Sequence, residues 1–170
     1  MKVIRDCISQ ELHDALNTEI RSLAGHQVWL SSAVDWCDSI KQGIQGSTLT
    51  TPMPDALCEM VEEEIKEHLP PYDELKCSFY IWQANSGIAM HNDNNYKFGG
   101  TIYLNDEWYP QWGGLYVWID KGAPEDAVGH ALLPKARTCV LNNQSEYHMV
   151  TPVSPYAQAP RFTVQFRAHK

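Results

Sequence analysis

The early part of the chain carries hydrophobic residues at helical spacing. Apolar side chains recur every three or four positions over residues 10–24 and would form one face of a helix. They are Leu12, Ala15, Leu16, Ile20 and Leu23. Ser9 is available as the N-cap of this helix, and acidic Glu11 and Asp14 fall in its early turns. The pattern therefore predicts a helix over residues 10–24.

A second helical pattern covers residues 54–68. Leu57, Val61 and Ile65 step by four positions, and Pro70 with Pro71 would end the helix because proline cannot continue it. The acidic residues within this range, from Glu59 to Glu67, are explained by a solvated helix face. We interpret the segment between the two helices, residues 43–51, as a loop.

From residue 76 onward the pattern changes to short runs rich in β-branched and aromatic residues, separated by Gly, Pro and Asn. The predicted strands are residues 76–82, 99–105, 114–119, 137–142, 147–153 and 161–168, and His91 ends a further short strand. Helical patterns do not alternate with these strands, so a doubly wound parallel sheet is not expected. We predict a mainly β (α+β) protein, with a jelly-roll core, or double-stranded β-helix, and the N-terminal helices packed outside it.

Length and composition fit one domain. A chain of 170 residues with 44% hydrophobic residues can bury an ordinary core. We expect a single domain over 1–170, with a mainly helical support region at 1–75 and the jelly-roll core at 76–168. No run of about 18 apolar residues occurs, and the N-terminus lacks the apolar stretch of a signal peptide. These features predict a soluble, cytoplasmic protein without a membrane role.

Charge and cysteine content argue against several classes of protein. The net charge of −8 disfavours non-specific binding to nucleic acid or anionic membranes. The five cysteines, at positions 7, 37, 58, 77 and 139, are scattered and form no Cys-x-x-Cys pair. We therefore expect reduced, mostly buried thiols in place of a disulfide framework or a zinc ribbon.

His91 and Asp93 form a candidate metal-binding pair. Alternate side chains of a strand project to one face, so this imidazole and this carboxylate could bind one metal from a single strand. Chance alone would give roughly 0.4 His-x-Asp matches in this composition, so the tripeptide is weak evidence by itself. Its polar surroundings give no hydrophobic reason for an imidazole, which favours a metal site over a surface turn.

His148 is the candidate third ligand, because a late strand of a barrel can lie beside an early one. Two His and one carboxylate occupy one face of an octahedron and leave positions open for other ligands. The alternative is a hydrogen-bonded histidine at a strand edge. Downstream, alternation puts Arg161, Thr163 and Gln165 on one strand face, which could line a pocket and bind a carboxylate. The alternative for Arg161 is exposure on an edge strand.

Taken in order, these residues resemble a known family. The ordered set is His91-x-Asp93, Tyr103-Leu104-Asn105 with Trp108, Gly113-Gly114-Leu115, His148 and Arg161. Over roughly residues 76–168 the chain resembles the Fe(II)/2-oxoglutarate-dependent oxygenases, particularly the prolyl hydroxylase-like branch. The set is specific as a whole, although each motif alone is weak.

The resemblance implies a role for each matching residue. It implies that His91, Asp93 and His148 are the iron ligands and catalytic centre. The implied 2-oxoglutarate-binding residues are Arg161, which pairs with the distal carboxylate, with Tyr103, Thr163 and Tyr80. For Tyr103 the alternative is a core tyrosine bonded to backbone. The branch commonly has a tyrosine ten residues before the first ligand, where this chain has Ile81, so Tyr80 fills that role only with a one-residue shift.

The resemblance also implies a reaction. It predicts Fe(II), 2-oxoglutarate and dioxygen as cofactor and co-substrates, with ascorbate as a candidate reductant, and hydroxylation of a protein or peptide residue, prolyl first. A carboxylate ligand, Asp93, favours hydroxylation over halogenation. Two alternatives stay open: the same chemistry on a small molecule such as a free amino acid, and a non-catalytic jelly-roll protein that binds a metal or an anion.

Overall fold

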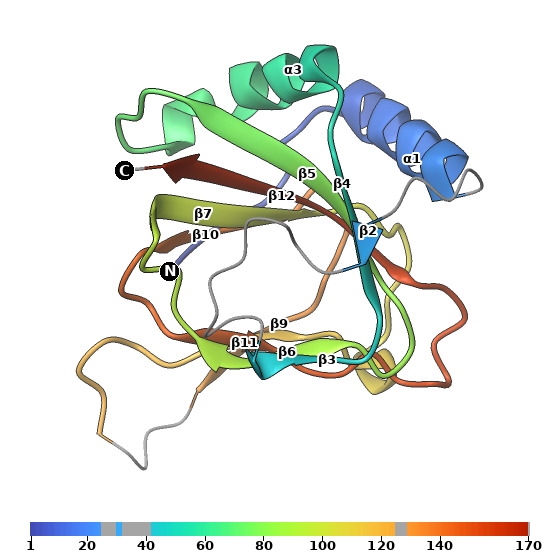
Figure 1. Cartoon of the computed structure of the whole chain (residues 1–170), viewed down its shortest axis with the longest axis vertical. Helices are drawn as coiled ribbons and strands as arrows, with labels where there is room; N and C mark the ends of the chain where they lie inside the picture. Colours follow the sequence, from blue (N-terminus) through green and yellow to red (C-terminus); the bar gives the residue numbers. More distant parts are fainter. Residues whose placement is uncertain (25–29, 32–41, 125–128, 170) are drawn as a thin grey trace.

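Two antiparallel sheets stacked face to face form the body of the protein (Figure 1). The structure is a computed structural model, and it describes residues 1–24, 30–31, 42–124 and 129–169. The larger sheet has the strand order β1-β10-β7-β12-β5-β4-β2, and the smaller sheet has the order β3-β6-β11-β8-β9. The predicted mainly β jelly-roll class is confirmed.

The strand bounds follow from this topology. The larger sheet contains β1 (Lys2–Ile4), β2 (Leu30–Ser31), β4 (Thr48–Pro52), β5 (Leu75–Trp82), β7 (Tyr96–Tyr103), β10 (Cys139–Asn143) and β12 (Arg161–His169). The smaller sheet contains β3 (Ile44–Gln45), β6 (Gly87–His91), β8 (Tyr116–Trp118), β9 (His130–Leu132) and β11 (His148–Val150).

Two helices cover the outer face of the larger sheet (Figure 1). Helix α1 (Gln10–Ala24) occupies the predicted range, and its cap is Ser9, whose Oγ accepts a hydrogen bond from the Leu12 backbone N–H at 3.2 Å. Helix α3 (Asp55–Ile65) continues into a 3₁₀ turn at Lys66–His68 before the two prolines. Since the apolar stripes of both helices pack on the sheet, the helices brace it from outside.

Strand β12 shows how the sequence sorts side chains between two cores. Phe162, Val164 and Phe166 point to the helices and join the core between helices and sheet. Arg161 and Thr163 alternate with them and so lie on the inner face, which the smaller sheet covers. The inner space holds a second, largely aromatic core that includes Tyr80, Trp82, Tyr103, Trp108, Trp112 and Tyr116.

The N-terminal part contains more strand than predicted. The loop prediction for residues 43–51 is wrong, because β3 and β4 lie there and β4 pairs with β5 from Thr48↔Trp82 to Pro52↔Ser78. The run from Thr48 to Thr51 has the β-branched composition of a strand, but Gly43 and Gly46 beside it masked the signal. Three further short strands, β1, β2 and β9, were also missed.

The described cysteines are free. Cys7, Cys77 and Cys139 are buried and Cys58 is half-buried, while Cys37 lies outside the described residues. Within the described part of the chain, no helix combines the length and apolar character that crossing a membrane requires.

Candidate metal centre

The smaller sheet brings two histidines together. Strand β6 ends at His91 and β11 begins at His148, and these residues are direct partners in the antiparallel pairing of the two strands. Asp93 lies two positions past the end of β6, in a turn closed by a hydrogen bond from the Tyr96 N–H to the Asp93 carbonyl at 3.0 Å. The expectation that His91 and Asp93 project from one strand is thus wrong for Asp93. This residue lies in the turn after β6, and the turn directs its carboxylate toward His91.

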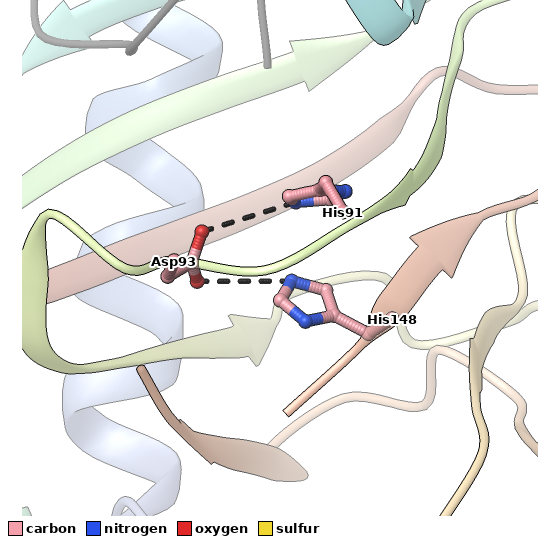
Figure 2. A group of neighbouring side chains, drawn as sticks. All are labelled: His91, Asp93 and His148. Carbon is pink, nitrogen blue, oxygen red and sulfur yellow. Dashed lines mark ion pairs between the residues drawn. The ribbon is translucent and has the colours of Figure 1, made fainter. Parts of the chain in front are cut away.

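The three side chains converge on one point (Figure 2). His91 Nε2 lies 3.9 Å from Asp93 Oδ1, and His148 Nε2 lies 3.7 Å from Asp93 Oδ2. One ligand atom from each residue falls within 4.8 Å of the others. The structure therefore brings together all three residues that the sequence nominated as ligands.

Backbone carbonyls orient both imidazole rings. His91 Nδ1 lies 2.7 Å from the Ala89 carbonyl oxygen, and His148 Nδ1 lies 3.1 Å from the Glu146 carbonyl oxygen. A carbonyl can only accept, so Nδ1 carries the proton in each neutral ring and Nε2 keeps its lone pair. Both lone pairs then face the Asp93 carboxylate, as a metal site requires.

Two further residues hold the site in shape. Asn142 on β10 donates from Nδ2 to Asp93 Oδ2 at 2.7 Å. The Tyr116 ring stacks on the His148 ring, with 4.9 Å between centroids and 12° between planes. The hydrogen bond restrains the Asp93 carboxylate and the stacking restrains the His148 imidazole.

The environment keeps His148 neutral. Burial lowers the pKa of His148 to about 4, with the Asp93 carboxylate opposing that shift and His91 adding to it. Neutral imidazole is the form that binds metals. Two imidazoles and one carboxylate match the donor set of non-haem iron sites, so the residues present fit such an ion.

Arg161 and Tyr103 form a second polar group on the inner face. Arg161 is 1% exposed, and its Cζ lies 5.1 Å from the centre of the Tyr103 ring and 5.2 Å from that of Trp82. Among the described residues, Arg161 Nε and Nη1 and the Tyr103 hydroxyl have no hydrogen-bond partner. Burying such groups unpaired is costly, so their donors fit an anionic ligand.

The electrostatics of this pair suit a carboxylate. Burial raises the pKa of Tyr103 above its ordinary value, while the Arg161 charge acts in the opposite direction. The phenol thus keeps its proton and can donate it. A guanidinium remains charged in proteins and donates to both oxygens of a carboxylate.

Gly114 makes room for Arg161. A Cβ at this position would lie 2.9 Å from Arg161 Cδ, and its φ of +61° is a conformation that side-chain-bearing residues rarely adopt. The Gly113-Gly114 motif therefore has a structural reason: Gly113, with a φ of +65°, would bring a Cβ to 2.2 Å from the Pro152 carbonyl oxygen.

Thr163 and Tyr80 lie on the inner face but have other partners. The Thr163 hydroxyl accepts a hydrogen bond from Trp82 Nε1 at 3.2 Å. The Tyr80 hydroxyl accepts one from Arg167 Nη2. Ile81, in contrast, belongs to the core under the helices. The roles predicted for Thr163 and Tyr80 at a co-substrate remain predictions.

A small hollow between the sheets opens on the metal-ligand candidates. Besides His91, Asp93 and His148, it is lined by Trp82, Tyr96, Tyr116, Asn142, Gln165 and Arg167. Trp82 is one of these lining residues, and Arg161 lies against the same indole. Sequence reasoning missed Asn142 and Arg167. For Arg167 the signal was present, since it continues the alternation of Arg161, Thr163 and Gln165 along β12.

Comparison with solved structures identifies the fold. The chain is similar to a Pseudomonas putida prolyl-4-hydroxylase, with a TM-score of 0.75 and 17% identity over 99% of this chain and 91% of that one. It is also similar to a Trichoplax adhaerens prolyl hydroxylase in complex with a hypoxia-inducible-factor peptide fragment, with a TM-score of 0.72 and 14% identity over 99% and 82% of the two chains.

A third similar structure is HygX from Streptomyces hygroscopicus, which has nickel and 2-oxoglutarate bound. Its TM-score is 0.67, with 10% identity over 99% of this chain and 82% of that one. No protein-family model matches the sequence, and no curated protein matches it. The chain thus has the jelly-roll fold of the prolyl 4-hydroxylases and other Fe(II)/2-oxoglutarate oxygenases.

Proposed function

We propose that this chain is an Fe(II)- and 2-oxoglutarate-dependent dioxygenase that hydroxylates its substrate. The observation that carries the proposal is the convergence of His91, Asp93 and His148 at one point inside an oxygenase fold. The orphaned Arg161 and Tyr103 donors on the same inner face support it. A purely structural metal would need neither of them, so a protein that only binds a metal is the weaker account.

The three ligands would hold Fe(II) through His91 Nε2, His148 Nε2 and an Asp93 oxygen. With 2-oxoglutarate and dioxygen, the iron supplies the oxidising power for hydroxylation when it is bound. The chain's own contribution is geometric. Nδ1 hydrogen bonds to the Ala89 and Glu146 carbonyls aim both imidazoles, and Asn142 restrains the carboxylate.

Arg161 and Tyr103 would bind the distal carboxylate of 2-oxoglutarate. The guanidinium supplies charge and paired N–H donors, and the phenol supplies an O–H donor. A 2-oxo acid that extends from the metal ligands to Arg161 would pass Trp82. The Trp82 indole is held in place by the hydrogen bond that it donates to the Thr163 hydroxyl. Trp82 and Tyr116 thus form walls that keep water from the co-substrate.

For the substrate we propose a residue of a protein or peptide, with proline first. The support is likeness to two structures named as prolyl hydroxylases, one of them in complex with a peptide fragment. The same chemistry on a small molecule, such as a free amino acid, is the alternative, because loops around a shared fold set the substrate.

The proposal is tested by turnover. Protein supplied with Fe(II), 2-oxoglutarate and air is screened against proline-containing peptides and free amino acids, and succinate and a product gaining one oxygen atom are measured. We expect His91→Ala and Asp93→Ala to abolish iron-dependent turnover. Arg161→Ala should mainly raise the 2-oxoglutarate concentration that gives half the maximal rate.

A matched control is available. His130 on β9 pairs with Asp120 at 2.9 Å and is exposed, so His130→Ala also breaks a His–Asp pair but leaves the metal-ligand candidates intact. This variant should keep wild-type activity. Full activity in His91→Ala or Asp93→Ala would refute the assignment.

A further inference from the structure

Arg167 is a second arginine on the inner face of β12. It pairs with Lys76 of β5 on one side and with Gly99 of β7 on the other, and Gly99 in turn pairs with Asn142 of β10. These four residues form one row across the sheet. Arg167 lines the same hollow as the metal-ligand candidates, whereas Lys76 does not.

Aromatic neighbours hold the Arg167 head in a fixed position. Nη1 donates to the Tyr96 hydroxyl at 2.9 Å, and Nη2 donates to the Tyr80 hydroxyl. The guanidinium carbon lies 5.1 Å from the centre of the Tyr96 ring and 5.8 Å from that of the Tyr80 ring. The side chain is thus preorganised, so little conformational freedom is lost when its remaining N–H groups bind a ligand.

The charge of Arg167 has no direct counter-charge. Both acceptors are phenol hydroxyls. Within the described part of the chain no carboxylate lies at ion-pair distance from the guanidinium, although, against the effect of burial, the Asp93 charge helps to raise the pKa of Arg167 from further away. The carboxylate that shares the hollow is Asp93, and its two oxygens face His91 Nε2 and His148 Nε2. Once that carboxylate binds a metal ion, the hollow holds a fixed cation in need of an anion.

The row also shows how near Arg167 lies to the reacting centre. A Cβ at Gly99, its neighbour on β7, would lie 3.3 Å from Asp93 Oδ2. Because Gly99 has no side chain, this neighbour of Arg167 leaves the space beside the Asp93 carboxylate unfilled. Arg161 is distinct from this group, since it lies at the opposite end of the β12 inner face against Trp82 and Tyr103.

We propose that Arg167 binds a carboxylate of the primary substrate and so makes this enzyme selective for anionic substrates. The inference rests on the proposed function and specifies its substrate class. A carboxylate can come from a free amino acid or from an Asp or Glu side chain beside the target residue in a peptide. In either case the anion, paired with Arg167, would position the rest of the substrate at the metal.

The test uses matched charged and neutral probes. Wild-type protein loaded with Fe(II) and 2-oxoglutarate is titrated without oxygen, by calorimetry, with free L-amino acids and their carboxamides. A second arm uses peptides with Asp or Glu and the same peptides with Asn or Gln. In one of these two comparisons, we expect the probe with the carboxylate to bind about ten- to a hundredfold more tightly than the matching amide.

Variants then assign the preference to Arg167. Arg167→Gln should remove the preference for carboxylate probes over amides, while the affinity for 2-oxoglutarate changes less than about twofold. Lys76→Gln is the control, because Lys76 carries the same charge in the same row but is exposed, pairs with Glu74 at 3.8 Å and lies outside the hollow. Arg167→Lys, which keeps the charge, should retain part of the preference.

Three results would overturn the inference: equal affinity for charged and neutral probes, binding of no carboxylate probe, or a preference that survives Arg167→Gln. A loss of 2-oxoglutarate binding in Arg167→Gln would also overturn it, because Arg167 would then serve the co-substrate. Failure of wild-type protein to bind 2-oxoglutarate with Fe(II) refutes the proposed function instead, so the two failures are distinguishable.

Discussion

Asn142 is the residue on which the position of the Asp93 carboxylate depends most directly, through the 2.7 Å hydrogen bond to Oδ2. Asn142→Leu keeps a similar volume but removes the donor. We predict a loss of Fe(II) affinity of about 10- to 100-fold, measured by anaerobic calorimetry. Asn143→Leu, at an exposed position on the same strand, should leave the affinity unchanged. Equal affinities in wild type and Asn142→Leu would show that Asp93 needs no such restraint.

His148 should make the stability of the metal-free protein depend on pH. Its pKa is lowered from 6.5 to about 4, chiefly by burial, so the unfolded chain takes up the proton first as pH falls. The stability from the neutral ring is complete above pH 6.5 and is lost as pH falls towards 4. The loss approaches about 3 kcal/mol.

Urea unfolding at pH 7 and pH 4.5 measures this dependence. In His148→Gln, which cannot take up that proton, the difference in unfolding free energy between the two pH values should be smaller than in wild type. An unchanged difference in the variant would rule out His148 as its source.

At the scale of elements, the turn before β8 makes room for Arg161, the residue proposed to bind 2-oxoglutarate. Gly114→Ala would force a Cβ to 2.9 Å from Arg161 Cδ, so we predict weaker 2-oxoglutarate binding in addition to backbone strain of about 1 kcal/mol. Gly122→Ala is the control, since Gly122 has a φ of +79° but nothing within 4 Å of its Cβ position. The control should show strain alone. Equal 2-oxoglutarate affinity in both variants would contradict a role for Gly114 at Arg161.

The Ser9 cap links the two outer helices. Its Oγ accepts from the Leu12 N–H and donates to Glu64 Oε1 at 2.7 Å. Ser9→Ala should lower the unfolding free energy by about 1 kcal/mol in urea denaturation. Thr18→Ala removes only an exposed bond to the Asp14 carbonyl within α1 and should cost less. A Ser9→Ala protein as stable as wild type would mean that the cap is dispensable.

Elements with strong local patterns were predictable from the sequence. Helix α1 has both an apolar stripe and a cap, and β12 alternates cleanly, which is why Arg161 was assigned to a polar strand face. Strand β3 was not predictable because two residues carry too little local pattern and depend on pairing with β6. Strand β4 has a β-branched run, but Gly43 and Gly46 beside it favoured a loop interpretation.

At the scale of the whole molecule, the site forms where remote strands meet. His91 and His148 pair across β6 and β11, while Asn142 comes from the opposite sheet (Figure 1). The order of the motifs along the sequence was enough to predict the three candidate metal ligands. The roles of Asn142 and Gly114 depend on strand register and on close contacts, which one sequence does not reveal. The inward direction of Arg167 follows from the alternation along β12, but its position in the hollow does not.

The central claim is that His91, Asp93 and His148 bind Fe(II) while Arg161, on the same inner face, binds the distal carboxylate of 2-oxoglutarate. It is tested most directly by anaerobic titration of Fe(II) and then 2-oxoglutarate, with the visible charge-transfer band of the chelated complex as the signal. We predict a band in wild type, none in His148→Ala, and one that needs more 2-oxoglutarate in Arg161→Ala. Folded wild-type protein that gives no band, or His148→Ala that gives an equal one, would contradict the account.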